Sequence, residues 1–325
     1  MSVFVTGGTG CLGYHLLSMF TKTKGQLVSY SLSSPKPYRK LKHVTYCTGD
    51  LLDEKKLSQA LKEYRPDEIY HVAAQNSVGL SQKKPLDTLK TNFLGTQILF
   101  ECVRKTVPRS RIVFISSDEL YGSGKGVVDV IHTESDPVIP LTPFATSKAS
   151  CELLAQQYIN SHKMDIIIVR PFHFSGPYQS IQFVLPAVAK QIAEIILFDG
   201  ELSIFTGNLD VSRDYLDVRD LARAITLLFP LGKTGEIYNI CSGKARTIRD
   251  LVNILITITG KPIDIRIDPS RERPVDIPLL VGSPEKMMNL TGWKPIISIE
   301  DSLNDLYTEM KRRIKLSRKN GRHTM

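Results

Sequence analysis

A glycine-rich turn directly after the first apolar segment limits what the N-terminal half of the chain can fold into. Residues 3–6 are typical of a short strand, residues 7–13 have the sequence GGTGCLG, and a helical pattern continues from Leu12. Glycines at 7, 10 and 13 allow a tight turn, close approach of the backbone to a pyrophosphate and close packing of helix on strand. The free amides at the start of the helix would face the anion. The pattern predicts a dinucleotide-binding unit whose candidate contacts are Gly7, Gly10, Cys11, Leu12 and Gly13.

Short β-rich segments alternate with helical patterns through the first half of the chain. The candidate strands are residues 3–6, 26–31, 44–48, 68–72, 111–116 and 165–170. The helical patterns between them, residues 12–21, 54–63, 89–105 and 147–162, are long enough to cross over and cover both faces of a sheet. This alternation predicts an α/β fold with a Rossmann-like, doubly wound parallel sheet of six strands.

The pattern changes after Gly176 and Pro177, where longer helices, isolated short strands and proline-containing turns begin. We therefore expect residues 1–172 to form mainly an NAD(P)-binding domain. Residues 173–310 should form mainly a smaller substrate-binding lobe, with some exchange of chain between the two. Residues 311–325 carry seven of the Lys and Arg residues behind the formal net charge of +9. We expect this basic tail to be a frayed, solvated terminus, and we expect no nucleic-acid partner.

The remaining composition excludes several classes of protein. No stretch approaches 18 consecutive apolar residues, so we expect neither a membrane span nor a secretory signal, and a cytoplasmic location. The five cysteines are odd in number, scattered and never spaced as CxxC. They predict neither a disulfide framework nor a metal site.

The end of the second predicted strand bears on the identity of the dinucleotide. An acid there would hold the ribose hydroxyls of NAD and repel a 2′-phosphate, but residues 27–34 offer hydroxyls, including that of Ser31, and no acid. Lys36, Arg39 and Lys40 follow and favour an added phosphate. We expect NADP, with NAD as the alternative.

Three further candidate cofactor contacts follow other predicted strands: Asp50, Leu51 and Ala73. Asp50 could reach an adenine amino group, or it could cap the helix that follows.

Several motifs resemble those of the extended short-chain dehydrogenase/reductases. They are TGGTGCLG at residues 6–13, SSDELYG at 116–122, PFATSKAS at 143–150, and RPF at 170–172 with the later Gly176–Pro177. Residues 190–193, 212–220 and 268–276 add a resemblance to the GDP-sugar branch, which contains 4,6-dehydratases and 4-keto-6-deoxy-sugar reductases. The resemblance extends to residue 295. It favours a reductase, because the first glycine loop lacks the glutamine-aspartate-glycine variant of the GDP-mannose dehydratases.

The resemblance implies roles for the central motifs. Lys148 would bind the nicotinamide ribose and lower the pKa of a neighbouring phenol, while Ser117 would donate a hydrogen bond to the reacting oxygen of the sugar. The phenol is expected at position 144, where this chain has Phe144, natural or introduced. Phenylalanine keeps the ring and lacks the hydroxyl that carries the proton. We therefore expect turnover by the chain as it stands to be impaired.

Two other positions leave alternatives open. Asp118 and Glu119 are adjacent carboxylates of the kind a 4,6-dehydratase uses as acid and base, but they could also be surface acids. His173 stands where the family has an asparagine on the phosphate side of the substrate, and it could donate a hydrogen bond there or be packed in the core.

The resemblance assigns the nucleotide-sugar diphosphate to Arg213 and Arg273, because a planar guanidinium can grip two oxygens at once. The alternative is a salt bridge between lobes with Asp217 or Asp276. Gln179 is a further candidate contact to sugar or phosphate.

These observations support three interpretations of the function. The first is an NADP-dependent reductase of a GDP-4-keto-6-deoxy-hexose. The second is a 4,6-dehydratase that uses Asp118 and Glu119, and the third is a catalytically silent homologue that binds nucleotide-sugars or dinucleotides. The family also implies a homodimer through the helices expected at 89–105 and 147–162, which carry apolar residues on more than one face.

Overall fold

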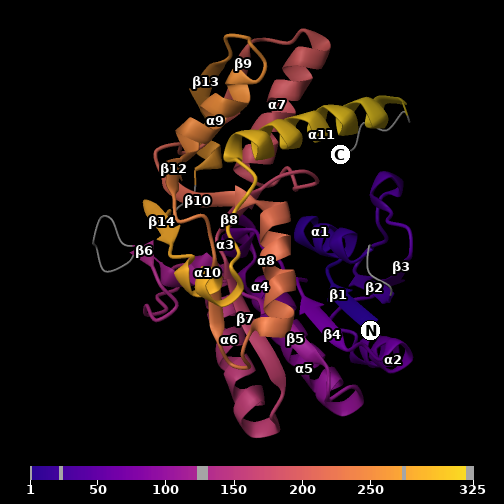
Figure 1. The fold of residues 1–325 in the computed structure, drawn as a ribbon. Helices are drawn as coiled ribbons and strands as arrows, with labels where there is room; N and C mark the ends of the chain where they lie inside the picture. Colours follow the sequence, from indigo (N-terminus) through magenta and orange to yellow (C-terminus); the bar gives the residue numbers. More distant parts are fainter. Residues whose placement is uncertain (1, 22–24, 123–130, 273–275, 320–325) are drawn as a thin grey trace.

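The computed structural model describes residues 2–21, 25–122, 131–272 and 276–319, which form two lobes. A parallel sheet and its covering helices make up the larger lobe (Figure 1). The second lobe, at the top of the view, contains the helices of residues 184–198, 248–257 and 299–319 with small sheets beside them.

The central sheet confirms the predicted doubly wound architecture. Its seven strands run in the order β11-β7-β5-β4-β1-β2-β3, and every neighbouring pair is parallel. The strands are β1 (Ser2–Thr6), β2 (Gln26–Ser31), β3 (Val44–Thr48), β4 (Glu68–His71), β5 (Arg111–Ile115), β7 (Asp165–Pro171) and β11 (Ile237–Ile240). Since β1 lies between β2 and β4, the strand order reverses at the carboxyl end of β1, where such sheets bind their ligands.

The sequence predicted six of these seven strands, each within one residue at either end. Strand β11 comes from the C-terminal half and pairs with β7 through Ile237 and Ile168. Its four residues, IYNI, are too few to be distinguished by pattern from the other short strands of that half.

Alternate residues of the strands enter two separate cores. Val3 and Val5 of β1 pack against α1 (Cys11–Phe20) and α8 (Val218–Leu231) on one face of the sheet. Phe4 packs on the other face against α2 (Glu54–Tyr64), α5 (Gly95–Thr106) and α6 (Pro143–His162). Burial of both faces explains why the strand segments are nearly continuous apolar runs in the sequence.

The helix predicted at residues 89–105 is interrupted in the structure. Helix α4 (Pro85–Leu89) continues through a π-helical turn, η2 (Lys90–Leu94), into α5. The turn carries Asn92, whose Nδ2 donates to Ser147 Oγ at 2.9 Å and whose Oδ1 accepts from the Gln75 amide at 2.7 Å. Asn92 thereby ties the loop after β4 to helix α6, which is a common use of such a turn near a functional site.

The second lobe has its own core, formed by α7 (Val184–Phe198), α9 (Ile248–Thr257) and α11 (Ile299–Lys319). Its strands form two small sheets. They are β6 (Ile131–His132), β8 (His173–Ser175), β10 (Ser212–Asp217), β12 (Ala245–Thr247) and β14 (Leu279–Gly282) in one, and β9 (Ser203–Thr206) with β13 (Asp264–Ile267) in the other.

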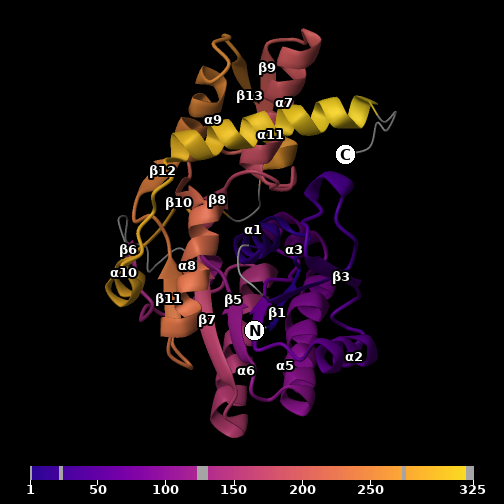
Figure 2. The ribbon, with the colours of Figure 1, turned by 45° about the vertical axis from the view of Figure 1, so that its right-hand side comes forward.

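The expectation of a frayed basic tail from residue 311 is wrong for the part that the structure describes. Helix α11 continues to residue 319 and runs across the second lobe beside α7 and α9 (Figure 2). Leu303, Met310 and Ile314 are buried on one face of α11, so this amphipathic face holds the helix to the lobe while the basic residues occupy the other faces. Within the described part of the chain, no helix has the length and apolar character needed to cross a membrane.

Candidate active site

A cleft of about 1210 Å³ lies between the two lobes, at the carboxyl edge of the central sheet. One wall comes from the turns after β1, β2, β4 and β5 and from the start of α6. The facing wall comes from the second lobe and includes His173, Gln179 and Arg213. Drug-sized ligands occupy pockets of roughly 300 to 1,000 Å³, so this cleft has room for an extended or composite ligand.

The glycine-rich turn has the close contacts that only glycine permits. Gly7 has a φ of +71°, and a Cβ there would lie 2.8 Å from the Cα of Ala73. A Cβ on Gly13 would lie 2.3 Å from the carbonyl oxygen of Gly7. Gly7 N donates to Tyr30 O at 2.8 Å, and Gly10 N donates to Gly7 O at 2.9 Å. The turn is therefore held in the compact form that the sequence predicted.

Cys11 and Leu12 follow the turn and also line the cleft. The Cys11 thiol donates to the carbonyl oxygen of Pro177 at 3.4 Å, and His15 Nε2 lies 3.1 Å from the same oxygen. Burial raises the pKa of the Cys11 thiol to about 12 and lowers the pKa of His15 to about 4, so both side chains are neutral near pH 7. Their role here is to join α1 to the loop that begins the second lobe.

The end of β2 and the segment after it line one end of the cleft without an acid. Ser31 Oγ accepts a hydrogen bond from Thr9 N at 3.2 Å. Arg39 Nη2 donates to the Gly10 carbonyl at 2.9 Å. The Arg39 guanidinium also lies 5.4 Å from the ring centre of Tyr14 and 5.1 Å from that of Tyr178. Arg39 is therefore fixed beside the glycine-rich turn.

The three other candidate cofactor residues, Asp50, Leu51 and Ala73, all line the cleft. Asp50 Oδ1 accepts from Leu52 N at 3.0 Å, and Ala73 N donates to Thr6 Oγ1 at 3.2 Å. The alternative that Asp50 caps the next helix is wrong, because Asp53 caps α2 by accepting from Lys56 N at 3.0 Å.

The loop after β5 brings a hydroxyl and two carboxylates into the cleft. Ser117 begins the short helix η3 (Asp118–Tyr121), and its Oγ accepts from Glu119 N and donates to Asp118 Oδ1, both at 3.2 Å. Asp118 and Glu119 are buried and line the cleft, so they are not surface acids.

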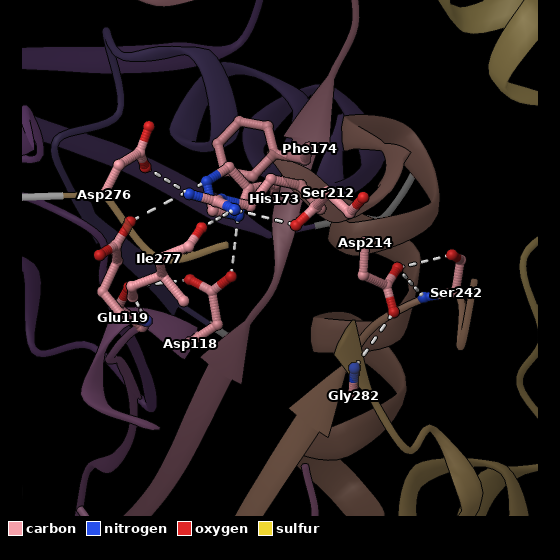
Figure 3. A network of polar contacts seen from close by, with 12 residues as sticks. Asp118, Glu119, His173, Phe174, Ser212, Asp214, Ser242, Asp276, Ile277 and Gly282 are labelled. Atoms are coloured by element: carbon pink, nitrogen blue, oxygen red, sulfur yellow. Dashed lines mark hydrogen bonds and ion pairs between the residues drawn. The ribbon is translucent and has the colours of Figure 1, made fainter. Parts of the chain in front are cut away.

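His173 joins this group from the opposite wall, and Figure 3 shows its ring beside the two carboxylates. Its Nδ1 lies 2.9 Å from Asp118 Oδ2, and its Nε2 lies 4.0 Å from Glu119 Oε1. The ring centre is 5.4 Å from that of Tyr215 on β10. The side chain is 21% exposed, which excludes a packed core histidine.

Helix α6 places Phe144 and Lys148 one turn apart, and both line the cleft. The Thr142 side chain caps the helix by accepting from Ala145 N at 3.2 Å. Lys148 Nζ donates to the carbonyl oxygen of Ile115 at 2.6 Å and lies 5.1 Å from the ring centre of Phe114. Burial lowers the pKa of Lys148 to about 8.

Arg213 is buried and already paired. Its Nη2 lies 2.6 Å from Asp276 Oδ1, and its Nη1 donates to the carbonyls of Ser212 and Ile277 at 2.9 and 2.5 Å. The salt bridge with Asp276 is therefore present, but it lies within the second lobe and not between lobes, and Arg213 and Asp276 both line the cleft. Asp217 pairs with Arg219 instead, at 2.8 Å. Arg273 lies outside the described residues.

Gln179 lies in the cleft wall, and only the nitrogen end of its side-chain amide has a hydrogen-bond partner among the described residues. Its Nε2 donates to the Phe174 carbonyl at 2.9 Å, while its Oε1 is buried without a hydrogen-bond partner among the described residues. The neighbouring Tyr178 and Arg313 of helix α11 also line the cleft, and neither was predicted from the sequence as a site residue. The apolar spacing along residues 299–314 is the signal that could have placed Arg313 in a packed helix.

A doubly wound sheet with a glycine-rich turn at its switch point, and with Ser117 and Lys148 in the same cleft, defines a dinucleotide-binding protein of the extended short-chain dehydrogenase/reductase class. A family model described as GDP-mannose 4,6 dehydratase matches residues 4–306, and the chain belongs to this family. The family assignment made from the motifs is thereby confirmed, and it places the chain among nucleotide-sugar-modifying enzymes.

Individual relatives match over nearly the whole chain. GDP-6-deoxy-D-mannose reductase of Pseudomonas aeruginosa is 32% identical over 313 residues, which cover 96% of this chain and 98% of the relative. The structure of RMD from the same organism complexed with NADPH superposes with a TM-score of 0.83 at 31% identity, covering 96% of this chain and 99% of that one. UDP-glucose 4-epimerase of Thermus thermophilus in complex with NAD has a TM-score of 0.84 at 28% identity, with coverage of 96% and 99%.

Proposed function

We propose that the chain is an NADP-dependent reductase of a GDP-4-keto-6-deoxy-hexose. The observation that carries the proposal is that Ser117 and Lys148 share one cleft with the glycine-rich turn. The turn fits a dinucleotide, because added Cβ atoms at Gly7 and Gly13 would collide with the backbone that shapes it. The bound cofactor supplies a hydride. Similarity to a GDP-6-deoxy-D-mannose reductase supports the choice of reaction and of a GDP-linked substrate.

The phosphorylated form of the cofactor is supported by the residues around the end of β2. Ser31, Lys36 and Arg39 line the cleft there, and no acid occurs between residues 27 and 40. A cation without a competing carboxylate favours a 2′-phosphate over a free ribose hydroxyl. The related reductase structure contains NADPH.

Separate residues would bind the substrate, bind the cofactor ribose and supply the proton. The Ser117 hydroxyl can donate a hydrogen bond to the keto oxygen, and Lys148 can bind the nicotinamide ribose. Gln179, Arg213 and Arg273 are the candidates for the nucleotide-sugar. Phe144 has no hydroxyl to deliver a proton, and a positioned acid contributes about 10²–10⁴-fold, so we propose slow turnover by the chain as it stands.

A 4,6-dehydratase is the second candidate, because Asp118 and Glu119 are buried side by side in the cleft. In that reaction Asp118 would have to present a proton to a leaving hydroxyl. Its Oδ1 is 3.2 Å from Ser117 Oγ and its Oδ2 is 2.9 Å from His173 Nδ1, so a proton on either oxygen faces a protein partner. This geometry favours the reductase.

The test is incubation of the purified protein with GDP-4-keto-6-deoxymannose and NADPH, and separately with GDP-mannose and NADP. A reductase consumes NADPH absorbance and gives a product heavier by two hydrogens. Loss of water from GDP-mannose without net NADPH use would establish the dehydratase instead. Binding of NADPH without either reaction, also in the Phe144→Tyr variant, would favour a silent binding homologue.

A further inference from the structure

Three side chains form a continuous hydrogen-bonded chain in the cleft. Ser117 Oγ contacts Asp118 Oδ1 at 3.2 Å, and Asp118 Oδ2 contacts His173 Nδ1 at 2.9 Å. This series of hydrogen bonds connects the two lobes. Ser117 follows β5 of the first lobe, and His173 begins β8, which pairs with β10 of the second lobe. Its Ser117 end lies where the proposed function puts the reacting oxygen.

The proposed reduction needs one proton for each hydride, and the cleft must hold a group that can release it. Phe144 carries no proton to give. Burial lowers the pKa of Lys148 to about 8, but its amine donates to the Ile115 carbonyl at 2.6 Å and not to the Ser117 hydroxyl. Histidine is the side chain that ordinarily exchanges a proton near neutral pH. His173 is 21% exposed, so it can be reprotonated from water, whereas the Asp118 side chain is only 5% exposed.

We infer that His173 is the proton source of this cleft, acting through Asp118 and Ser117; the inference rests on the proposed reductase function. As the keto carbon accepts the hydride that a bound reduced cofactor would supply, the Ser117 hydroxyl turns from Asp118 Oδ1 to the keto oxygen and gives it its proton. Ser117 recovers a proton from Asp118, which receives one from the His173 imidazolium. Ketone, hydride and one proton thus give alcohol, oxidised cofactor and neutral His173, which water then reprotonates.

The groups around His173 come from two elements, η3 and β10. Asp118 and Glu119 face it from η3, at 2.9 and 4.0 Å from its two ring nitrogens. Tyr215 faces it from β10, where the two residues are paired in register. Arg213 lies two residues earlier on β10, and its guanidinium is held by Asp276 at 2.6 Å.

The test compares kcat and its pH dependence in four proteins: the chain as it stands, His173→Asn, Phe144→Tyr and the double variant. Asparagine can keep a hydrogen bond to Asp118 but has no proton to release near neutral pH. His43→Asn is the matched control, because His43 is exposed and has a φ of +64°, a conformation that asparagine tolerates. NADPH affinity is measured for each protein, to separate loss of chemistry from loss of fold.

In the chain as it stands, kcat should decrease with rising pH, and His173→Asn should weaken this dependence and lower kcat by about tenfold or more. In the Phe144→Tyr background, His173→Asn should lower kcat by less than about threefold, because a phenol then carries the proton. His43→Asn should change neither quantity.

Two results would overturn the inference while leaving the proposed function in place. The first is an equal kcat and an equal pH dependence for the chain as it stands and for its His173→Asn variant. The second is activity that is present only in Phe144→Tyr and in the double variant. Absence of reductase activity in all four proteins, with NADPH still bound, would overturn the inference together with the proposed function.

Discussion

Arg313 Nη2 donates a hydrogen bond to the carbonyl oxygen of Gln179 at 2.8 Å and so connects helix α11 to the wall of the cleft. The same guanidinium pairs with Glu309 Oε2 at 2.9 Å, and that oxygen also accepts from Tyr178 N at 3.3 Å. A basic segment whose sequence is typical of a solvated tail therefore fixes the loop that carries Tyr178 and Gln179.

Arg313→Ala should destabilise the protein. It removes the charged donor of the Gln179 carbonyl and of the buried Glu309, which then keeps, among the described residues, only the weaker hydrogen bond from Tyr178 N. Loss of a donor to a buried group typically costs about 1–3 kcal/mol. Urea denaturation should give a lower free energy of unfolding for Arg313→Ala, and no change for the exposed Lys315→Ala on the same helix. Equal stability of the two variants would mean that α11 does not hold this loop.

NADPH should bind more tightly than NADH, by about tenfold or more if Arg39 contacts the added phosphate. Arg39→Ala should reduce the affinity for NADPH much more than that for NADH, so NADH serves as the internal control. Fluorescence titration measures both dissociation constants. Equal constants in the unchanged protein would contradict the assignment of NADP.

The buried Lys148 side chain should lower the free energy of unfolding of the protein at neutral pH. Burial depresses its pKa to about 8, from about 10.4 in an unfolded chain, so between these values the unfolded state binds more protons and stability rises with pH. At pH 7, below both pKa values, the cost is on the order of 3 kcal/mol. Lys148→Met should therefore be more stable than the unchanged protein at pH 7, and the difference should shrink by pH 10. A constant difference across this range would contradict the depressed pKa.

The expected homodimer can be tested on helix α6. Leu153 is 74% exposed on that helix, and an aspartate there would place a charge in any interface that buries it. Leu153→Asp should convert a dimer into a monomer by light scattering, whereas Ile296→Asp, at a 68% exposed position of the second lobe, should not. A monomeric unchanged protein at micromolar concentration would contradict the expectation.

The elements that were predicted correctly from the sequence are those whose structure is set by residues close together in the chain. The six strands and the glycine-rich turn were found because apolar runs and glycine spacing report local geometry. Strand β11 and the helix containing Arg313 were missed, because a four-residue strand and a charged amphipathic helix take their structure from distant partners. The contact between His173 and Asp118 depends on how β8 pairs with β10 in the second lobe, which residue type alone does not report.

The central claim is tested most directly by following the transferred hydrogen. The chain and its Phe144→Tyr variant are each incubated with GDP-4-keto-6-deoxymannose and NADPH that carries deuterium at the transferred position, and the product is analysed by mass spectrometry and NMR. The reductase account predicts one deuterium on the former keto carbon for each NADPH consumed. It also predicts a rate for Phe144→Tyr that is higher by about 10²-fold, because the phenol adds a positioned acid. A product without deuterium on that carbon, or one formed with no NADPH consumed, would contradict the account.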